Sequence, residues 1–157
     1  MINIIKGNSN SGKTRYLKNL YKETPKGDGV LSLKYYEKDE FLGYNLFHLK
    51  TGKQKPFIRL KTKLPENWAE KYKTGKYSFS MSGFQFAEEI LCNIDEAPVY
   101  IDEIGPLEIM QRKGFYQIVK NLLDRDIEIF LTVRDSLFDK LIATFSITGK
   151  TKIIIIK

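Results

Sequence analysis

The sequence predicts an α/β protein with a mostly parallel central sheet, because short apolar runs alternate with amphipathic segments along the chain. Near the start, Ile2 to Lys6 has the pattern of a strand, and it leads directly into a helix expected over Thr14 to Lys22. At the other end, Lys152 to Ile156 contains four consecutive isoleucines. Such a run predicts a strand that is buried on both faces, as in a parallel sheet.

The remaining elements follow from the same alternation and from the residues that interrupt it. Further strands are expected at 30–34, 77–81, 98–102 and 127–133, with an antiparallel hairpin of strands at 44–49 and 57–60 inserted among them. Helices are expected at 115–123 and 136–142. Another helix is expected to begin at Ser82, because Gln85 three residues later completes a capping box. The stretch 107–113 is expected to be an ordinary loop that starts a helix, with Pro106 in its first turn.

The length and composition indicate one globular domain over residues 1–157. A chain of 157 residues with 42% apolar residues can form one core but not two comfortable ones. Cys92 is the only cysteine and His48 the only histidine, which excludes an intrachain disulfide and a Cys/His zinc cluster. No run of about 18 apolar residues is present. We therefore expect a cytoplasmic protein that does not associate with membranes.

The net charge of +7 is concentrated in one stretch. Residues 50–76 contain nine basic and two acidic side chains, so this stretch accounts for the whole excess. Phe57, Trp68, Tyr72 and Tyr77 are interleaved with these lysines or adjacent to them. A basic strip with exposed aromatics could bind single-stranded nucleic acid. We favour the alternative that the aromatics belong to the core and the lysines form a solvated face, because lysine dominates over arginine and no RNA-binding fingerprint is present.

A phosphate-binding loop is the most specific motif in the chain. It matches G-x-x-x-x-G-K-[ST] at every fixed position and consists of Gly7, Asn8, Ser9, Asn10, Ser11, Gly12, Lys13 and Thr14. Such a loop surrounds an anion with backbone N–H groups, and the helix that follows points its positive end at the same place. Lys13 would reach the β- and γ-phosphates, and Thr14 would supply a hydroxyl to Mg²⁺. The sequence therefore predicts a P-loop fold that binds nucleoside triphosphates.

Two adjacent acids, Asp102 and Glu103, end an apolar strand. Ligands of open α/β sheets bind at the carboxyl ends of the strands, which places both acids near the phosphate loop if the two strands are close. Asp102 would then hold Mg²⁺, directly or through a water. Glu103 would orient and deprotonate the water that attacks the γ-phosphate.

With both motifs identified, the chain resembles the small nucleoside-triphosphatase family of P-loop proteins, which includes the cancer-related nucleoside triphosphatase of animals and relatives in thermophilic archaea and bacteria. The resemblance is carried by the loop 7–14, by the run Ile-Asp-Glu-Ile-Gly-Pro-Leu-Glu at 101–108, by Val-Arg-Asp-Ser at 133–136, and by a similar stretch at 75–86. It implies a three-layer, RecA-like sheet in which one strand lies between the loop strand and the acidic strand. It also implies hydrolysis of several nucleoside triphosphates with Glu103 as the catalytic residue.

Other candidate site residues depend on their expected positions. Relatives commonly have a glycine where this chain has Asn10, a residue that tolerates left-handed backbone better than most. Arg134 follows a strand and could stabilise charge on the transferring phosphate, or could form a salt bridge with Asp135, Asp139 or another carboxylate. Gly105 is expected close to the phosphates. Arg15 contacts either the base or ribose, or only solvent.

Three functions remain open at this point. The favoured one is Mg²⁺-dependent hydrolysis of ATP, GTP and other nucleoside triphosphates to the diphosphate and phosphate. The second is a small P-loop nucleotide or nucleoside kinase, although such kinases usually carry an arginine-bearing lid and this chain has no clustered pair of arginines. The third is a slow nucleotide-binding switch that contacts RNA.

Overall fold

A computed structural model describes residues 1–157, and the phosphate loop lies in the parallel half of its nine-stranded sheet. In spatial order β2-β7-β8-β1-β9, the parallel strands are β2 (Asp28–Glu37), β7 (Val99–Ile104), β8 (Ile129–Arg134), β1 (Ile2–Gly7) and β9 (Thr151–Ile156). Their pairings are all parallel. One strand, β8, separates β1 from β7, which confirms the strand order implied by the family resemblance.

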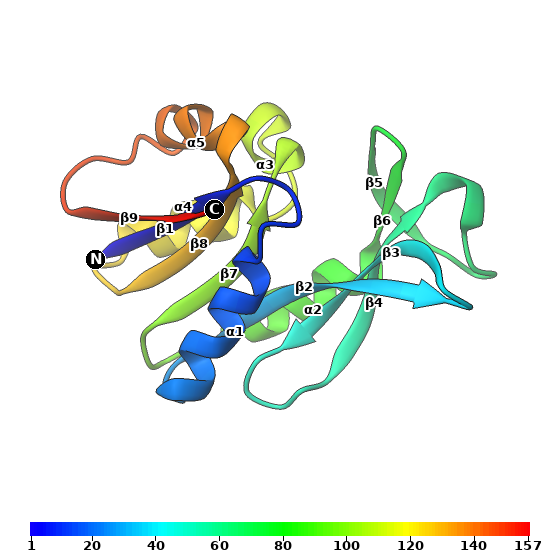
Figure 1. The fold of residues 1–157 in the computed structure, drawn as a ribbon, viewed down its shortest axis with the longest axis horizontal. Helices are drawn as coiled ribbons and strands as arrows, with labels where there is room; N and C mark the ends of the chain where they lie inside the picture. The colour runs from blue at the N-terminus through cyan, green and yellow to red at the C-terminus, as the bar shows by residue number, and fades with distance from the viewer.

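The other half of the sheet is antiparallel and larger than the predicted hairpin. It consists of β3 (Glu40–His48), β4 (Gln54–Leu60), β5 (Glu70–Thr74) and β6 (Tyr77–Ser80), in the order β5-β6-β4-β3. The predicted hairpin is present as β3 and β4, and the sheet as a whole is mixed. The two halves are joined by β2, whose residues 28–30 pair with β7 while residues 30–37 pair with β3. Figure 1 shows the antiparallel strands extending to one side of the parallel sheet.

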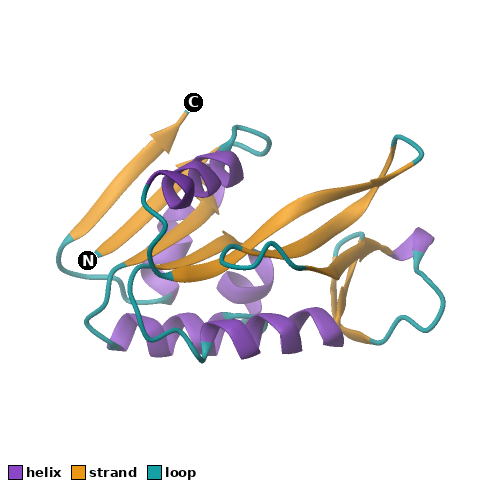
Figure 2. Ribbon diagram, turned by 90° about the horizontal axis from the view of Figure 1, so that it is seen from below, coloured by secondary structure: helices purple, strands orange, loops and turns teal.

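Helices cover both faces of the parallel strands and form a three-layer arrangement (Figure 2). They are α1 (Lys13–Glu23), α2 (Met81–Leu91), α3 (Pro106–Gln111), α4 (Tyr116–Asp124) and α5 (Phe138–Thr144), with short 3-10 turns at Lys61–Lys63 and Asp135–Leu137. Neighbouring strand residues face opposite layers. Ile5 packs in the cluster that contains Leu17 of α1, whereas Ile4 packs in the larger cluster with side chains of α2 to α5. No helix is long and apolar enough to cross a membrane.

The start of α2 differs from the sequence prediction. The helix begins at Met81, and its N-cap is Ser80, whose hydroxyl accepts a hydrogen bond from the Gly83 N–H at 2.9 Å. An N-cap residue needs extended backbone so that its side chain can reach back to the first turn. Ser80 has that conformation because it ends β6, whereas Ser82 already lies within the helix. The prediction of Ser82 as the cap was therefore wrong by two residues.

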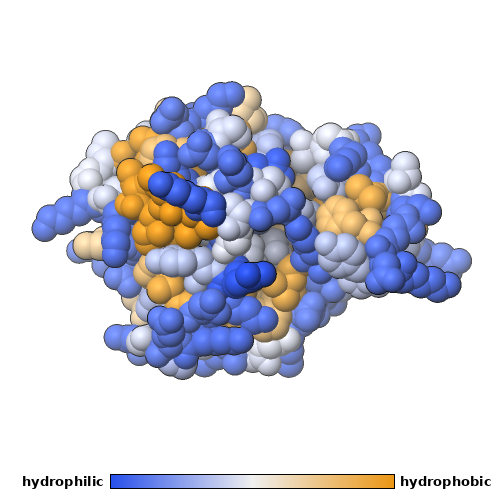
Figure 3. Space-filling model, viewed as in Figure 1, coloured by the Kyte–Doolittle hydropathy of each residue, from blue (hydrophilic) through white to orange (hydrophobic).

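The expected burial of β9 on both faces is also wrong. This strand pairs only with β1 and forms an edge of the sheet. Ile153 is 48% exposed and Ile155 59% exposed, while Ile154 and Ile156 pack against the α1 side of the core. Figure 3 shows the resulting apolar surface over β9. A run of isoleucines is the same whether one face or both faces of a strand are covered, so only the packing of the layers reveals that one face of β9 is open.

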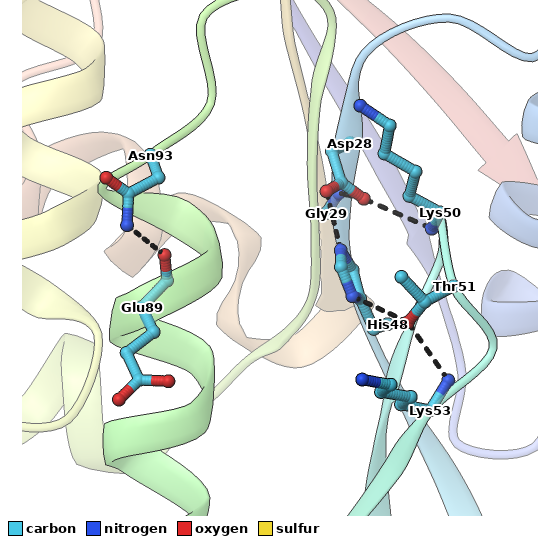
Figure 4. Close-up of polar contacts among 8 residues, drawn as sticks. All are labelled: Asp28, Gly29, His48, Lys50, Thr51, Lys53, Glu89 and Asn93. Carbon is cyan, nitrogen blue, oxygen red and sulfur yellow. Dashed lines mark hydrogen bonds and ion pairs between the residues drawn. The ribbon is translucent and has the colours of Figure 1, made fainter.

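The only histidine lies at the end of the sheet that is opposite the phosphate loop, where it links two segments of the chain. His48 at the end of β3 contacts the Asp28 carboxylate through Nε2 at 2.6 Å and the Thr51 hydroxyl through Nδ1 at 2.8 Å (Figure 4). Asp28 also accepts hydrogen bonds from the N–H groups of Gly29 and Lys50. These contacts connect the turn between β3 and β4 to the first residue of β2.

Candidate active site

The phosphate loop lies between β1 and α1 and is closed by tight backbone contacts. Gly12 has φ 101 and Asn10 has φ 62, so both adopt left-handed backbone. A Cβ on Gly7 would lie 2.6 Å from the Ser11 hydroxyl and 2.6 Å from the Ile156 carbonyl oxygen. The loop therefore requires glycine at positions 7 and 12, and Asn10 adopts the conformation for which glycine is usually chosen.

Lys13 is held inside the loop that it would serve. Its side chain is 3% exposed, and Nζ donates to the carbonyl oxygens of Gly7 at 3.2 Å and Asn8 at 2.8 Å. The Ser11 hydroxyl is the only buried side-chain polar atom without a hydrogen-bond partner. Buried polar groups are normally paired, so an orphaned hydroxyl in this loop fits a ligand with acceptor oxygens. The N-terminus of α1 adds backbone N–H groups to the same place.

Asp102 is fixed by three hydrogen bonds behind the loop. Its Oδ2 accepts from the Thr14 hydroxyl at 2.7 Å and from the Ser32 N–H at 3.0 Å, and its Oδ1 accepts from the Thr132 hydroxyl at 2.6 Å. The carboxyl is 1% exposed, and burial raises its pKa although these hydrogen bonds and Lys13 oppose the shift. The geometry thus joins the acidic strand to the loop through Thr14.

Glu103 is aimed by an irregularity in the sheet. The register between β7 and β8 shifts between Ile101 and Ile104, and Glu103 has φ 61. Its N–H donates to the Thr132 hydroxyl at 2.7 Å. Such bulges redirect a side chain and are common next to active sites. Burial first, and then the neighbouring charge of Asp102, raises the pKa of Glu103.

Arg134 ends β8 on the same sheet edge and forms no salt bridge. Asp135, one of its expected partners, instead pairs with Lys6 at 3.2 Å. Arg134 and Glu103 line the same cavity, and the positive charge of Arg134 partly opposes the rise in the pKa of Glu103. The competing prediction of a salt bridge to Asp135 or Asp139 is therefore wrong.

Lys13, Thr14, Glu103 and Arg134 line one cavity of about 300 Å³, whereas Asp102 is not part of its lining and bonds to Thr14 and Ser32 in the wall. It is lined by the loop residues 9–15, which include Arg15, by Ser32, Leu33 and Lys34 of β2, by Tyr44 of β3, and by Glu103 and Arg134. Gly105 lies outside this cavity, in the wall of an adjoining one. Its backbone is extended, with φ −129, and a Cβ would lie no closer than 3.9 Å to another atom. The geometry therefore does not require glycine at position 105.

Sequence reasoning missed one cationic and one aromatic residue of the cavity, Lys34 and Tyr44. Lys34 donates a hydrogen bond to the Asn10 side chain, and Tyr44 faces the charges of Glu103 and Arg134. Burial is the main cause that raises the pKa of Tyr44 to about 12. Lys34 follows the apolar start of β2 on the phosphate side of the sheet, so strand order could have identified it. Tyr44 enters from the antiparallel half, where no sequence signal places it.

The residues present fit a magnesium ion with few protein ligands. The Thr14 hydroxyl and the Asp102 carboxylate are hard oxygen donors and lie 2.7 Å apart. No group of three or more Asp, Glu, His or Cys side chains is arranged to hold a metal by itself. Mg²⁺ at phosphate sites usually takes one or two side-chain oxygens and completes its shell with water and phosphate. Thr14 and Asp102 match that pattern.

Comparison with known proteins agrees with this arrangement. The structure superposes on a human cancer-related nucleoside triphosphatase and on THEP1 from Aquifex aeolicus, each with TM-score 0.68 over 100% of this chain. The first is 18% identical with 89% of its chain covered, and the second 19% identical with 90% covered. These two similarities show the shared fold.

Similarity in sequence shows the family. The nucleoside-triphosphatase THEP1 of Archaeoglobus fulgidus is 31% identical over 111 residues, which cover 68% of this chain. The chain spans 61% of that relative's length. A family model described as NTPase matches residues 3–157, which is nearly the whole sequence. The chain therefore belongs to this NTPase family.

Proposed function

We propose that the protein hydrolyses nucleoside triphosphates to the diphosphate and phosphate in a Mg²⁺-dependent reaction. The observation that carries the proposal is the position of Glu103, which a bulge in β7 directs into the same cavity as the phosphate loop. A loop alone would support binding, whereas a half-buried carboxylate beside it supplies a base for water. Family membership and the name of the Archaeoglobus fulgidus relative support the same reaction.

Each side chain has a distinct part in this reaction. The N–H groups of the loop bind the phosphates, and Lys13 exchanges its two carbonyl partners for β- and γ-phosphate oxygens. Thr14 and Asp102 would hold Mg²⁺, which would supply positive charge to the phosphates. Glu103, which lines the same cavity as the phosphate loop, accepts the proton of the attacking water. Arg134 stabilises the charge that develops on the transferred group.

A broad substrate range is proposed because the family resemblance implies hydrolysis of several nucleoside triphosphates. Residues 9–15, most of them in the phosphate loop, supply about half of the residues that line the cavity. We therefore propose ATP and GTP, together with other nucleoside triphosphates, as substrates.

Phosphate release tests the proposal. The wild type is given ATP, GTP, CTP or UTP, each with and without Mg²⁺, and free phosphate is measured in the absence of any acceptor. Phosphate should appear with several of the four and only with Mg²⁺.

Lys13→Ala should abolish release because it removes the charge that bridges the β- and γ-oxygens. Lys22→Ala, an exposed lysine in the last turn of the same helix, is the matched control and should stay active. Turnover in a folded Lys13→Ala protein would contradict the proposal.

A further inference from the structure

A second cavity of about 290 Å³ adjoins the phosphate cavity. Both are lined by Ser32, Tyr44, Glu103 and Arg134, so these four side chains form a shared wall. The second cavity contains none of the phosphate-loop residues. Glu103 and Arg134 therefore face both the phosphate cavity and this second cavity.

The walls of this second cavity are mainly aromatic and aliphatic. Phe57 of β4 stacks against Phe115 with ring centroids 5.7 Å apart, and Phe79 of β6 meets Phe57 edge to face at 5.6 Å. A few polar groups interrupt this lining, among them the Thr74 hydroxyl and the Glu108 carboxyl. Small-molecule sites commonly have an apolar lining with a few placed polar groups.

The size of the cavity exceeds what hydrolysis requires. A water molecule takes about 30 Å³ of liquid volume, so the space is about ten times larger than one attacking water needs. Apolar walls also hold water poorly. The volume is close to the lower end of the range for organic ligands, about 300 Å³. Hydrolysis accounts for Glu103 and Arg134 but not for an aromatic cavity behind them.

We propose that this cavity binds a nucleoside as a second substrate, and that the protein transfers the γ-phosphoryl group to its hydroxyl. The planar base would lie against the aromatic walls, with Thr74 available to its polar edge, and the sugar hydroxyl would reach Glu103. The proposal rests on the phosphate-binding part of the proposed function. It adds an acceptor that competes with water for the same phosphoryl group.

The transfer balances without any further reactant. The hydroxyl oxygen of the nucleoside forms a bond to the γ-phosphorus, and the bond between that phosphorus and the β–γ bridging oxygen breaks. The hydroxyl proton passes to Glu103 and then to solvent. The products are a nucleoside diphosphate from the donor and a nucleoside monophosphate from the acceptor. A bound nucleoside also displaces water from Glu103, so hydrolysis should fall as transfer rises.

Transfer is measured with γ-labelled ATP, Mg²⁺ and each of adenosine, guanosine, cytidine and uridine. With at least one of the four, label should appear in the nucleoside monophosphate while labelled free phosphate decreases. Thr74→Trp places a bulky ring in the cavity and should reduce transfer about tenfold or more by steric exclusion. Phosphate release without nucleoside should stay near the wild-type rate, because Thr74 does not line the phosphate cavity.

Two further variants make the result decisive. Ile58→Trp fills the cavity from another strand and should give the same selective loss if Thr74→Trp does not fold. Thr62→Trp makes the matched exchange at an exposed position outside this cavity and should retain transfer. Phosphate release with no labelled monophosphate from any of the four nucleosides would overturn the inference and leave the proposed hydrolase intact. Transfer that survives in both folded cavity variants would also overturn it. If the wild type does not bind ATP, that result would instead contradict the proposed function.

Discussion

At the scale of single residues, Thr132 determines how the two adjacent acids divide their work. It is fully buried in the middle of β8, where its hydroxyl donates to Asp102 and accepts from the N–H of Glu103. Asp102 is thereby turned toward Thr14, while the left-handed backbone of Glu103 directs that side chain into the cavity. In a regular strand, neighbouring side chains point to opposite faces of the sheet. The bulge instead allows both acids to serve one site.

Exchange of Glu103 for glutamine separates binding from turnover. Glu103→Gln keeps the size of the side chain but removes the proposed base, and general-base catalysis is typically worth ~100- to 10,000-fold in rate. We expect phosphate release to fall by that order while the dissociation constant for the nucleoside triphosphate, measured by calorimetry, changes little. Asp102→Asn should instead raise the Mg²⁺ concentration needed for both binding and turnover.

The matched control for this exchange is Glu96→Gln, because Glu96 is exposed and lies before β7. It should behave as the wild type. Equal loss of affinity and rate in Glu103→Gln would show that Glu103 supports the structure and is not the base.

At the scale of one element, the short helix α3 depends on a buried acid. Glu108 accepts hydrogen bonds from the N–H groups of Gly105 and Phe115, each at 3.1 Å, and so joins the start of α3 to the start of α4. Gly114 has φ 62, and a Cβ there would come within 2.0 Å of the Glu108 carboxyl. The expected loop over 107–113 is therefore mostly helix. The Glu108 side chain accepts a hydrogen bond from the backbone N–H of Gly105 at the start of α3, which has no partner within the helix.

The ionisation of Glu108 makes the free energy of unfolding depend on pH. Burial, opposed by the backbone hydrogen bonds, raises its pKa from 4.5 to about 7. Below pH 4.5 the group is protonated in both the folded and the unfolded chain, so its contribution to stability is fully present. As the pH rises through about 7, the unfolded chain ionises first and this contribution is lost. At 1.36 kcal/mol for each pKa unit, the loss is about 3 kcal/mol.

Urea unfolding of the wild type and of Glu108→Gln measures this loss. The free energy of unfolding of the wild type, relative to that of the variant, should decrease by about 3 kcal/mol between low pH and about pH 8. Other titrating groups are common to both proteins and cancel in the difference. A difference that does not change with pH would show that Glu108 titrates normally.

At the scale of the whole molecule, charge and function are divided between the two halves of the sheet. The parallel half carries the phosphate loop, and the antiparallel half carries the basic stretch 50–76. The aromatic side chains of this stretch do not form an exposed strip: Phe57 lines the second cavity inside the molecule, Trp68 donates to the Ser78 hydroxyl at 2.9 Å, and Tyr72 contacts the large core cluster. They are therefore poorly placed to bind successive bases of a single strand, which supports the interpretation of the lysines as a solvated face. The absence of nucleic-acid binding stays a prediction.

Neutralising lysines of this stretch tests the interpretation. Exchange of Lys53, Lys55, Lys61 and Lys63 for glutamine should leave kcat near the wild-type value and raise KM modestly at low salt, because the local concentration of anionic substrate falls. The difference should fade as salt screens the field over about 10 Å at 0.1 M.

The control set removes four lysines from elsewhere, at positions 22, 26, 150 and 152, and keeps the same net charge as the first set. It should affect KM less. Tight, salt-sensitive binding of the wild type to single-stranded RNA, lost only in the first set, would favour the nucleic-acid interpretation.

The sequence by itself determined the features that depend on neighbouring residues. The phosphate loop needs only eight consecutive residues and the strand and helix around them, so its motif predicts its place. The acids at the end of an apolar strand and most of the strands and helices were predictable in the same way, whereas β5 and α3 were not predicted. The strand order came from the family resemblance, because periodicity does not show which strands are neighbours.

The tertiary structure decided whatever depends on contacts between distant residues. Ser80 caps α2 because β6 ends there, and the isoleucines of β9 are exposed on one face because Ile153 and Ile155 pack in neither core cluster. The aim of Glu103 depends on Thr132, which lies 29 residues away in sequence. The aromatic cavity needs β4, β6 and α3 to meet beside β7. These features arise from packing between distant segments. The local sequence pattern does not change with that packing, so it cannot predict them.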